Sequence, residues 1–361
     1  MDLEGLLKAS TINKNLETRL IEVYKMVKLL IIALLLLVAE LIYFRIADKF
    51  NIIDKPNERS SHSSVVLRGG GVIFLLGAWL YAAFYGVQLW PFLLGLTMIA
   101  GISFVDDVKP LPDSVRLVVQ FTAMGLMFYQ WGILHWEYWW VIILGLILCV
   151  GIINAYNFMD GINGITGGYS LAILLPLAWM NLKGGADVSG FTDQNLIYVT
   201  ILADLVFCLF NFRPRGKARC FAGDVGSVGV AFILVYMVGA LILKTGDFTY
   251  IMLLAIYGVD SVLTIVHRIM LHENIGQAHR KHVYQLMANE LKLSHVKVSL
   301  IYMFLQLAVA VGLILIPNNT IWHWAYLSTV LMLFALAYVL FKKKYYHLHE
   351  EYLTSISRSL Q

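Results

Sequence analysis

The stretch NAYNFMDGINGITGG, from Asn154 to Gly168, joins the end of one long apolar run to the start of the next. Asp160 lies in its middle, where the chain is expected to reach the membrane surface. A carboxylate is unfavourable there unless it meets water, a cation or a substrate, so Asp160 is a candidate functional residue. Asn157 and Asn163 lie three residues to either side, a spacing that predicts all three side chains on one helical face. The alternative is a plain Asn/Gly turn between two helices, which rarely needs such a polar register.

The composition is that of a membrane protein. Of 361 residues, 59% are hydrophobic and only 14% are charged, and the mean hydropathy is +0.73. Soluble chains carry about a quarter charged residues. Apolar runs of about 17 to 25 residues recur along the chain, as membrane-spanning helices do, so we predict an all-α, polytopic integral membrane protein. The eleven predicted spans are residues 27–47, 70–87, 90–106, 115–131, 138–155, 165–182, 195–212, 226–243, 249–267, 298–316 and 321–341.

The distribution of basic residues predicts the orientation. With the N-terminus outside, 20 of the 27 Lys and Arg fall in the inner connections, the tail and the adjoining helix ends, whereas the outer connections hold only Lys183 and Lys244. This asymmetry follows the positive-inside rule, so the C-terminus is predicted to be cytoplasmic. Residues 1–25 form a polar extension, either a short interfacial helix or the product of a start codon upstream of Met26. Residues 26–345 then form a single membrane domain, and residues 346–361 a cytoplasmic tail.

Two predicted inner segments carry candidate residues ahead of the central stretch. Asp106 and Asp107 end the third span, where they repel each other and oppose the negative end of the helix dipole. A nearby cation, or a base role for one carboxylate, explains this placement. The alternative is that both face cytosolic water with Lys109 as partner. Arg68 precedes three glycines (69–71) that allow close backbone approach, so it is a candidate contact for an anionic group, the alternative being a solvated basic loop.

The segment RPRGKARCFAGDVGS, from Arg213 to Ser227, opens the eighth span. Its four basic residues are explained by topology alone. Its Gly-Asp-x-Gly-Ser turn is not, because a carboxylate at a helix N-terminus, here Asp224, can hold Mg²⁺. The free backbone N–H groups of such a turn can also receive phosphate oxygens.

The longest predicted inner loop, from His267 to Met287, contains a compact basic cluster of His279, Arg280, Lys281 and His282. A zinc site is disfavoured, because no cysteine pair accompanies the histidines and their spacing does not match structural zinc patterns. A phosphate-binding cluster is favoured, since Arg and Lys repel a metal and attract a diphosphate. The alternative is an ordinary basic loop.

Together these segments place four carboxylates, glycine turns and a His/Arg cluster on one predicted face of a membrane domain. Carboxylates with a hard divalent cation, and basic groups for phosphate, are the equipment of phosphoryl transfer. A site at the bilayer surface implies that one substrate is a lipid. A transporter or flippase, and a non-catalytic scaffold, are the competing classes, but neither accounts for four carboxylates gathered on one face.

Four motifs, in this order, resemble a known family. They are DDVK (106–109), NAYNFMDGINGITGG (154–168), FAGDVGS (221–227) and AHRKHVYQ (278–285). From about Asp54 to Leu286 the chain resembles the polyprenyl-phosphate N-acetylhexosamine-1-phosphate transferases (glycosyltransferase family 4), the superfamily of phospho-N-acetylmuramoyl-pentapeptide transferase. The resemblance implies a reaction that depends on Mg²⁺, with Mn²⁺ as a substitute. In it, undecaprenyl phosphate attacks the β-phosphate of a UDP-activated amino sugar and UMP leaves.

The resemblance also implies roles for the residues at matching positions. The catalytic candidates match the paired aspartates near the lipid phosphate and the aspartate of the central motif: Asp106, Asp107 and Asp160. Asp224 matches the Mg²⁺-binding aspartate. The resemblance also implies an aromatic ring for uracil and a loop that closes over the diphosphate: Phe221, His279, Arg280 and His282. Two amides of the central motif and the arginine before the glycines complete the substrate-binding candidates from the residues alone: Asn157, Asn163 and Arg68.

One position departs from the family pattern. Where the family often has Asp, this chain has Asn163, which removes a negative charge and adds a hydrogen-bond donor. A metal or base role is therefore in doubt there, and altered contacts to the nucleotide sugar are expected. The AHRKHVYQ loop is closer to enzymes that initiate O-antigen, enterobacterial-type or capsular polysaccharides than to the peptidoglycan branch. This favours a UDP-N-acetylhexosamine donor, with muramoyl-pentapeptide transfer as the alternative.

The resemblance finally implies a setting. The protein is expected in the bacterial inner (cytoplasmic) membrane, with its active site facing the cytoplasm. Its expected partners are the lipid bilayer, undecaprenyl phosphate, a UDP-amino sugar and, by family likeness, a second copy of the chain in a homodimer. Nucleic acid is not among them.

Overall fold

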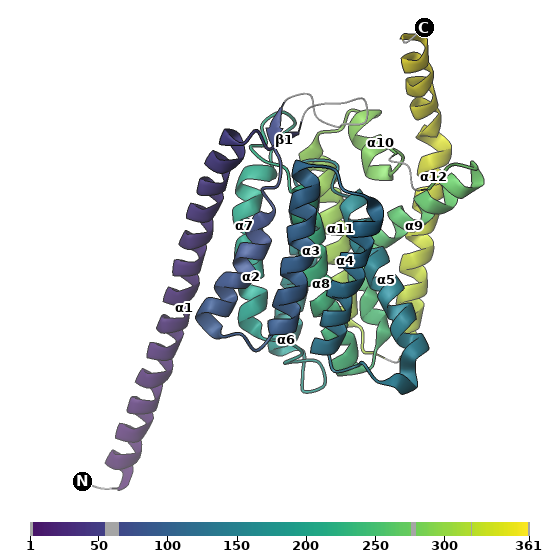
Figure 1. Ribbon diagram of the computed structural model, residues 1–361. Coiled ribbons are helices and arrows are strands. Elements are labelled where there is room, and N and C mark those ends of the chain that lie inside the picture. The colour runs from purple at the N-terminus through teal and green to yellow at the C-terminus, as the bar shows by residue number, and fades with distance from the viewer. Residues whose placement is uncertain (1–2, 55–64, 276–278, 319, 360–361) are drawn as a thin grey trace.

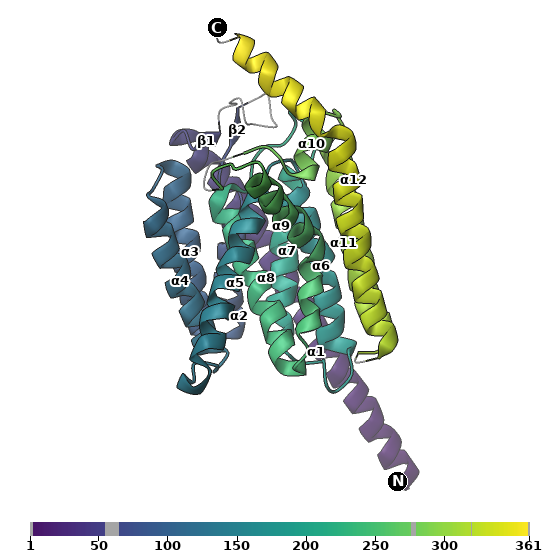
Figure 2. The same cartoon turned by 90° about the vertical axis from the view of Figure 1, so that its right-hand side faces the viewer.

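The computed structural model describes residues 3–54, 65–275, 279–318 and 320–359, with side chains from residue 17 to residue 355. This part of the chain is largely helical, and most of its helices lie side by side in one bundle (Figures 1 and 2). The elements are α1 (Leu3–Lys49), β1 (Ile53–Asp54), β2 (Val66–Leu67), α2 (Val72–Tyr85), α3 (Trp90–Val108), α4 (Asp113–Gln130), η1 (Trp136–Tyr138), α5 (Trp139–Phe158), α6 (Ile165–Lys183), α7 (Gln194–Asn211), α8 (Gly223–Thr245), η2 (Phe248–Leu254), α9 (Ala255–Met270), α10 (Val283–Asn289), α11 (His295–Leu315) and α12 (Ile321–Ser359).

Each of the eleven predicted ranges overlaps a helix. Within the described residues, nine helical segments are long and apolar enough to cross a membrane by length and composition. The predicted second span, α2, has only 14 residues, and α4 is not among the nine because its sequence contains Asp113, Arg116 and Gln120. The all-α, multi-pass class is confirmed, whereas the count of eleven spans and the membrane side of each terminus stay predictions.

Both ends of the chain continue a spanning helix. The polar extension and the first span form the single helix α1, and α12 passes the predicted start of the tail at residue 346 without a break. The two termini lie at opposite ends of the bundle (Figure 1). β1, α10 and the connections that carry the candidate residues lie at the same end of the bundle as the C-terminus (Figure 1).

α8 is the central helix of the bundle. It is apolar on all sides, as expected of an enclosed helix, and it packs against α2, α3, α5 and α6. Its first turn crosses the start of α2, where a Cβ atom on Gly71 would lie 2.1 Å from the Cα atom of Gly226. Because both positions are glycine, the two backbones can approach this closely, and the loop before α2 is held against the start of α8.

The predicted span at 249–267 begins as the 3₁₀ helix η2 before α9 continues it. The first N–H groups of α9 find side-chain acceptors instead of an earlier helical turn. Ile256 donates to Oε1 of Gln306 over 3.1 Å, and Tyr257 donates to the hydroxyl oxygen of Tyr169 over 3.1 Å. A helix that starts inside a membrane bundle requires such partners, since water does not supply them there.

Candidate active site

The central stretch forms a turn between two helices. α5 ends at Phe158 and α6 begins at Ile165, so the predicted common helical face of Asn157, Asp160 and Asn163 is wrong. Gly164, the N-cap of α6, adopts a φ of +83° and packs on the ring of Phe212, so the helical conformation resumes only after it. The three polar residues nevertheless line one cavity.

The glycine-rich loop before α2 joins the Phe221 segment by backbone hydrogen bonds. β1 pairs antiparallel with β2. Beyond this pair, the N–H of Phe221 donates to the carbonyl of Leu67 over 2.8 Å, and the N–H of Gly70 donates to the carbonyl of Phe221 over 2.9 Å. This small layer of extended chain places Asp54, Arg68 and Phe221 next to the start of α8.

Asp107 holds the start of α8. Its carboxylate accepts the backbone N–H groups of Asp224 (2.9 Å) and Val225 (3.0 Å), and it pairs with Nε of Arg68 over 2.7 Å. An acidic group at a helix N-terminus satisfies N–H groups that lack helical partners. Gly223 makes room for it: its φ is +69°, and a Cβ atom there would lie 2.5 Å from the carboxylate of Asp107.

Asp106 faces a second arginine. Its carboxylate accepts from the N–H of Leu111 over 2.7 Å and from Nη1 of Arg116 over 2.6 Å. The same Nη1 atom lies 3.3 Å from Oδ2 of Asp224, and Nη2 of Arg68 lies 3.6 Å from its Oδ1. Of the alternatives that the sequence left open for the aspartate pair, the structure shows positive charge beside both carboxylates. The cations are two arginines, and the ion pairs of the described residues do not include Lys109.

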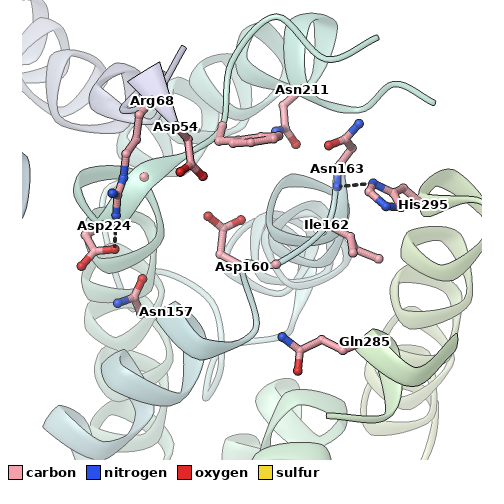
Figure 3. A pocket seen from close by; sticks show the side chains of 13 residues that line it. Asp54, Arg68, Asn157, Asp160, Ile162, Asn163, Asn211, Asp224, Gln285 and His295 are labelled. Atoms are coloured by element: carbon pink, nitrogen blue, oxygen red, sulfur yellow. Dashed lines mark hydrogen bonds and ion pairs between the residues drawn. The ribbon is translucent and has the colours of Figure 1, made fainter. Parts of the chain in front are cut away.

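These segments enclose a polar cavity of about 240 Å³ at one end of the bundle. The carboxylates of Asp54 and Asp160 point toward each other across it, with Arg68 and Asp224 beside them (Figure 3). The residues that line it are Asp54, Arg68, Asn157, Asp160, Gly161, Ile162, Asn163, Asn211, Phe221, Gly223, Asp224, Gln285 and His295. Six predicted residues therefore meet in one place: Arg68, Asn157, Asp160, Asn163, Phe221 and Asp224. Asp106 and Asp107 are not in the lining; they contact the residues that hold Asp224.

The two asparagines of the central stretch tie the cavity wall to other elements. Oδ1 of Asn157 accepts from the hydroxyl of Ser227 on α8 over 2.6 Å. Nδ2 of Asn163 donates to the carbonyls of Arg213 (2.9 Å) and Pro214 (3.1 Å). Asn163, where this chain departs from the family pattern, therefore acts as a clamp: its two hydrogen bonds hold the chain that follows α7.

The predicted histidine loop lies beside the cavity. His279 and His282 face each other with ring centroids 5.0 Å apart, and Nδ1 of His282 lies 3.4 Å from the carboxylate of Asp260. Burial, then the nearby charges of His282 and Arg268, lowers the pKa of His279 to about 3, so this side chain is neutral at physiological pH. Arg280 points elsewhere, to Glu290. None of the three predicted residues of this loop lines the cavity, whereas Gln285 of α10 does.

Asp160 has the electrostatics of a functional carboxylate. Its Oδ1 accepts a hydrogen bond from the hydroxyl of Thr166 over 2.5 Å. Burial raises the pKa of Asp160 to about 7; the hydrogen bond from Thr166 opposes the shift, and the charges of Asp224 and Asp107 add to it. A carboxyl group with its pKa near 7 can exchange a proton at physiological pH.

The donor set fits a magnesium ion that is shared with a substrate. Among the described residues, no three His, Cys, Asp or Glu side chains lie close enough to enclose a metal. Mg²⁺ does not require such a cage, since it commonly takes one or two carboxylates and completes its shell with water and substrate phosphates. Asp224, with Asp160 on the same cavity wall, offers oxygen donors of this kind.

Sequence reasoning missed five residues at or behind the cavity wall: Asp54, Arg116, Asn211, Gln285 and His295. Asn211 accepts the N–H of Gly164 over 2.7 Å, and Nδ1 of His295 accepts the N–H of Asn163 over 3.3 Å. A polar residue at the end of an apolar run was the available signal for Asn211, and a histidine after the helix cap Ser294 was the signal for His295. Neither signal indicates which turn the side chain meets.

Comparisons with known proteins agree with this architecture. Residues 89–242, which include α3 to α7 and most of α8, match the model of glycosyl transferase family 4. The chain is 26% identical to a Bacillus subtilis (strain 168) protein named Probable undecaprenyl-phosphate N-acetylglucosaminyl 1-phosphate transferase, over 88% of this chain and 92% of the relative. It is 24% identical to Undecaprenyl-phosphate alpha-N-acetylglucosaminyl 1-phosphate transferase of Escherichia coli (strain K12), over 82% and 84%.

A third relative matches a shorter part. Decaprenyl-phosphate N-acetylglucosaminephosphotransferase of Mycobacterium tuberculosis (strain ATCC 25618 / H37Rv) is 28% identical over 52% of this chain and 53% of its own length. The family match covers the segments that carry Asn157, Asp160 and Asp224, whereas Asp54, Arg68, Gln285 and His295 of the cavity lining lie outside it. The similarity to the first two transferases extends over most of the chain. Over residues 89–242 the chain is similar to glycosyl transferase family 4.

Proposed function

We propose that this protein transfers N-acetylhexosamine-1-phosphate from a UDP-sugar to undecaprenyl phosphate, forming undecaprenyl-diphospho-sugar and UMP. The observation that carries the proposal is the cavity in which Asp160, Asp224 and Arg68 meet at one end of a membrane bundle. The names of the similar proteins support a polyprenyl-phosphate acceptor and an N-acetylglucosamine-1-phosphate group. In this proposal the protein lies in the bacterial inner membrane, its cavity faces the cytoplasm, and its product initiates a cell-envelope polysaccharide.

The reaction exchanges one phosphoanhydride for another. An oxygen of the lipid phosphate attacks the β-phosphorus of the UDP-sugar, the bond from that phosphorus to the bridging oxygen breaks, and UMP leaves with the electron pair. The acceptor phosphate is already largely ionised at neutral pH, so the main task of the site is to offset repulsion between two anionic substrates. Arg68 is placed for this task, because its guanidinium group lines the cavity beside Asp224.

Asp224, with Asp160 beside it, would hold Mg²⁺ or Mn²⁺ together with the diphosphate of the donor. A divalent cation in that place supplies positive charge for the phosphate oxygens as negative charge redistributes in the transition state. Phe221 lines the same cavity and offers a ring for the uracil base.

We expect the purified protein to release UMP when it is given UDP-N-acetylglucosamine, undecaprenyl phosphate and Mg²⁺. The physical reason is that the cavity, at one end of the bundle, provides anionic groups for a cation and a cationic group for phosphate. UMP is measured by chromatography, and the lipid product by mass spectrometry. A panel of UDP-sugars, including UDP-muramoyl-pentapeptide, identifies the donor.

Two controls make the UMP assay specific. Omission of the lipid should abolish UMP release, which separates transfer from hydrolysis. EDTA should abolish it as well, and added Mg²⁺ or Mn²⁺ should restore it. If no UDP-amino sugar in the panel yields UMP, the protein is not a transferase of this class.

The pKa of Asp160 predicts a pH dependence. Below about pH 7 its carboxyl group is mainly protonated and neutral, and above that pH it is ionised. The ionised form can accept a proton or hold a cation, so kcat/KM for the UDP-sugar should rise between about pH 6 and pH 8, because this quantity reports the free enzyme. The residual activity of Asp160→Asn should lack this step. A wild-type profile that is flat over the same range would exclude Asp160 as the titrating group.

A further inference from the structure

The C-terminal part of α12 presents one face to the histidine loop. The residues on this face are Lys342, Tyr346, His349 and Tyr352, spaced by four, three and three positions, as neighbours on one side of a helix are. Figures 1 and 2 show α12 continuing past α10 toward the C-terminus, and the two helices are in contact. The neighbours Lys343 and His347 are exposed on the other side. The first part of the predicted tail, up to Tyr352, therefore packs against this loop.

A buried carboxylate connects this face to the loop. Glu290 directly follows α10, and its side chain is 3% exposed. Its Oε1 lies 2.8 Å from Nη2 of Arg280 and 3.0 Å from Nδ1 of His349, whose side chain is also 3% exposed. A buried charge is tolerated when it is paired, so Arg280 and His349 stabilise Glu290 together, one from each side.

Two further contacts fix the same segment. The guanidinium carbon of Arg280 lies 4.1 Å from the ring centroid of Tyr352, a cation–π contact. Nζ of Lys342 donates a hydrogen bond to the backbone carbonyl of Lys281, whose own ammonium group pairs with Glu273. These contacts hold the chain just before α10 at both its side chains and its backbone.

α10 connects the segment held by α12 to the cavity. The hydroxyl of Tyr284 donates to the carbonyl of Phe158 over 2.9 Å, and its ring packs on Gly161 in the Asp160 turn. The next residue, Gln285, lines the cavity and accepts the N–H of His282 over 3.2 Å. A shift of the segment before α10 would therefore move groups that the substrate meets.

We propose that the face of α12 formed by Lys342, Tyr346, His349 and Tyr352 positions the His279–Gln285 segment for binding of the UDP-sugar, with His349 and Tyr352 as positioning residues. This inference rests on the proposed function for its substrate. In this proposal Arg280 does not bind phosphate, although its charge suggested that role. It anchors the segment to Glu290 and Tyr352, and other groups contact the phosphate.

The test compares His349→Ala with His347→Ala, an exposed histidine of the same helix. His349→Ala should raise KM for the UDP-sugar about tenfold or more, since small displacements of binding groups have effects of this size. KM for undecaprenyl phosphate should change little, and His347→Ala should match the wild type. His349→Asn keeps a polar atom near the position of Nδ1 and should recover most of the affinity, which general destabilisation would not produce.

A second measurement does not depend on catalysis. Hydrogen exchange followed by mass spectrometry should show faster exchange across residues 280–290 in His349→Ala and in Tyr352→Ala, and wild-type exchange in His347→Ala. Tyr352→Ala removes a ring at the edge of the contact and serves if His349→Ala does not fold. Equal donor KM and equal exchange in Tyr352→Ala, His349→Ala and His347→Ala would overturn the proposal. A wild type without UMP release but with the expected exchange pattern would refute the transferase and leave the positioning contact intact.

Discussion

Asp224→Asn is expected to reduce transfer by about 10²–10³-fold, the size of effect seen when one group that stabilises transition-state charge is removed. The substitution keeps the shape of the side chain and removes its charge from the cavity. The N-terminus of α8 should stay in place, because the carboxylate that accepts its N–H groups belongs to Asp107. UMP release measures the activity, and thermal unfolding in detergent measures the stability.

Asp113→Asn is the matched control for this variant. Asp113 also lies near Arg116, with 3.7 Å between Oδ1 and Nη2, but its side chain is 86% exposed. Exposed ion pairs contribute about 0–1 kcal/mol, so activity and stability should both stay close to the wild type. If Asp224→Asn retains as much activity as Asp113→Asn, the negative charge of Asp224 takes no part in the reaction.

Asp107→Asn should behave differently from both. The two N–H groups bond to different oxygens of Asp107, and asparagine would replace one of these oxygens with an NH₂ group that faces a donor. It would also leave Arg68 without its closest carboxylate partner. Activity and thermal stability should therefore fall together, which distinguishes a residue that holds the site from one that lines it.

The sequence was sufficient to bring Asp160 and Asp224 together. Both lie where long apolar runs meet polar, glycine-rich turns, which predicts helix ends, and the resemblance of their motifs to a known family assigns both to one site. The positions of the apolar helices were predictable from the apolar runs, but α1 and α12 continue beyond the predicted spans into polar sequence. The arrangement of Asn157, Asp160 and Asn163 was not predictable, because the non-helical turn between α5 and α6 leaves the polar spacing in the sequence unchanged.

Side-chain direction was the part that sequence patterns could not supply. Arg280 has the charge expected of a phosphate ligand, yet its partners are Glu290 and, from α12, Tyr352. Asp107 is adjacent to Asp106 in sequence, but each meets a different arginine. In each case the decisive partner comes from another part of the chain, at a separation that no local spacing rule covers.

Asn163→Asp restores the residue that the related motif often has, and we nevertheless expect it to impair this protein. Nδ2 of Asn163 donates to the carbonyl oxygens of both Arg213 and Pro214, and a carboxylate would put negative charge against both. Leaving buried acceptors without a donor costs about 1–3 kcal/mol, and the added charge increases that cost. The chain after α7 leads to Phe221, so KM for the UDP-sugar should rise more than KM for the lipid.

Asn163→Ala removes the two hydrogen bonds without adding a negative charge. Comparing it with Asn163→Asp therefore separates the effect of the lost hydrogen bonds from the effect of the charge. Asn163→Asp should be the less stable of the two at pH 8, measured by thermal unfolding. Lowering the pH should narrow the gap, since a protonated carboxyl group can donate one hydrogen bond to a carbonyl. Wild-type stability and donor KM in Asn163→Asp would show that the clamp is dispensable. If Asn163→Asp is instead less stable than Asn163→Ala, the chain after α7 does not tolerate a carboxylate at this position. Asparagine then stands here because its amide donates to the carbonyl oxygens of Arg213 and Pro214.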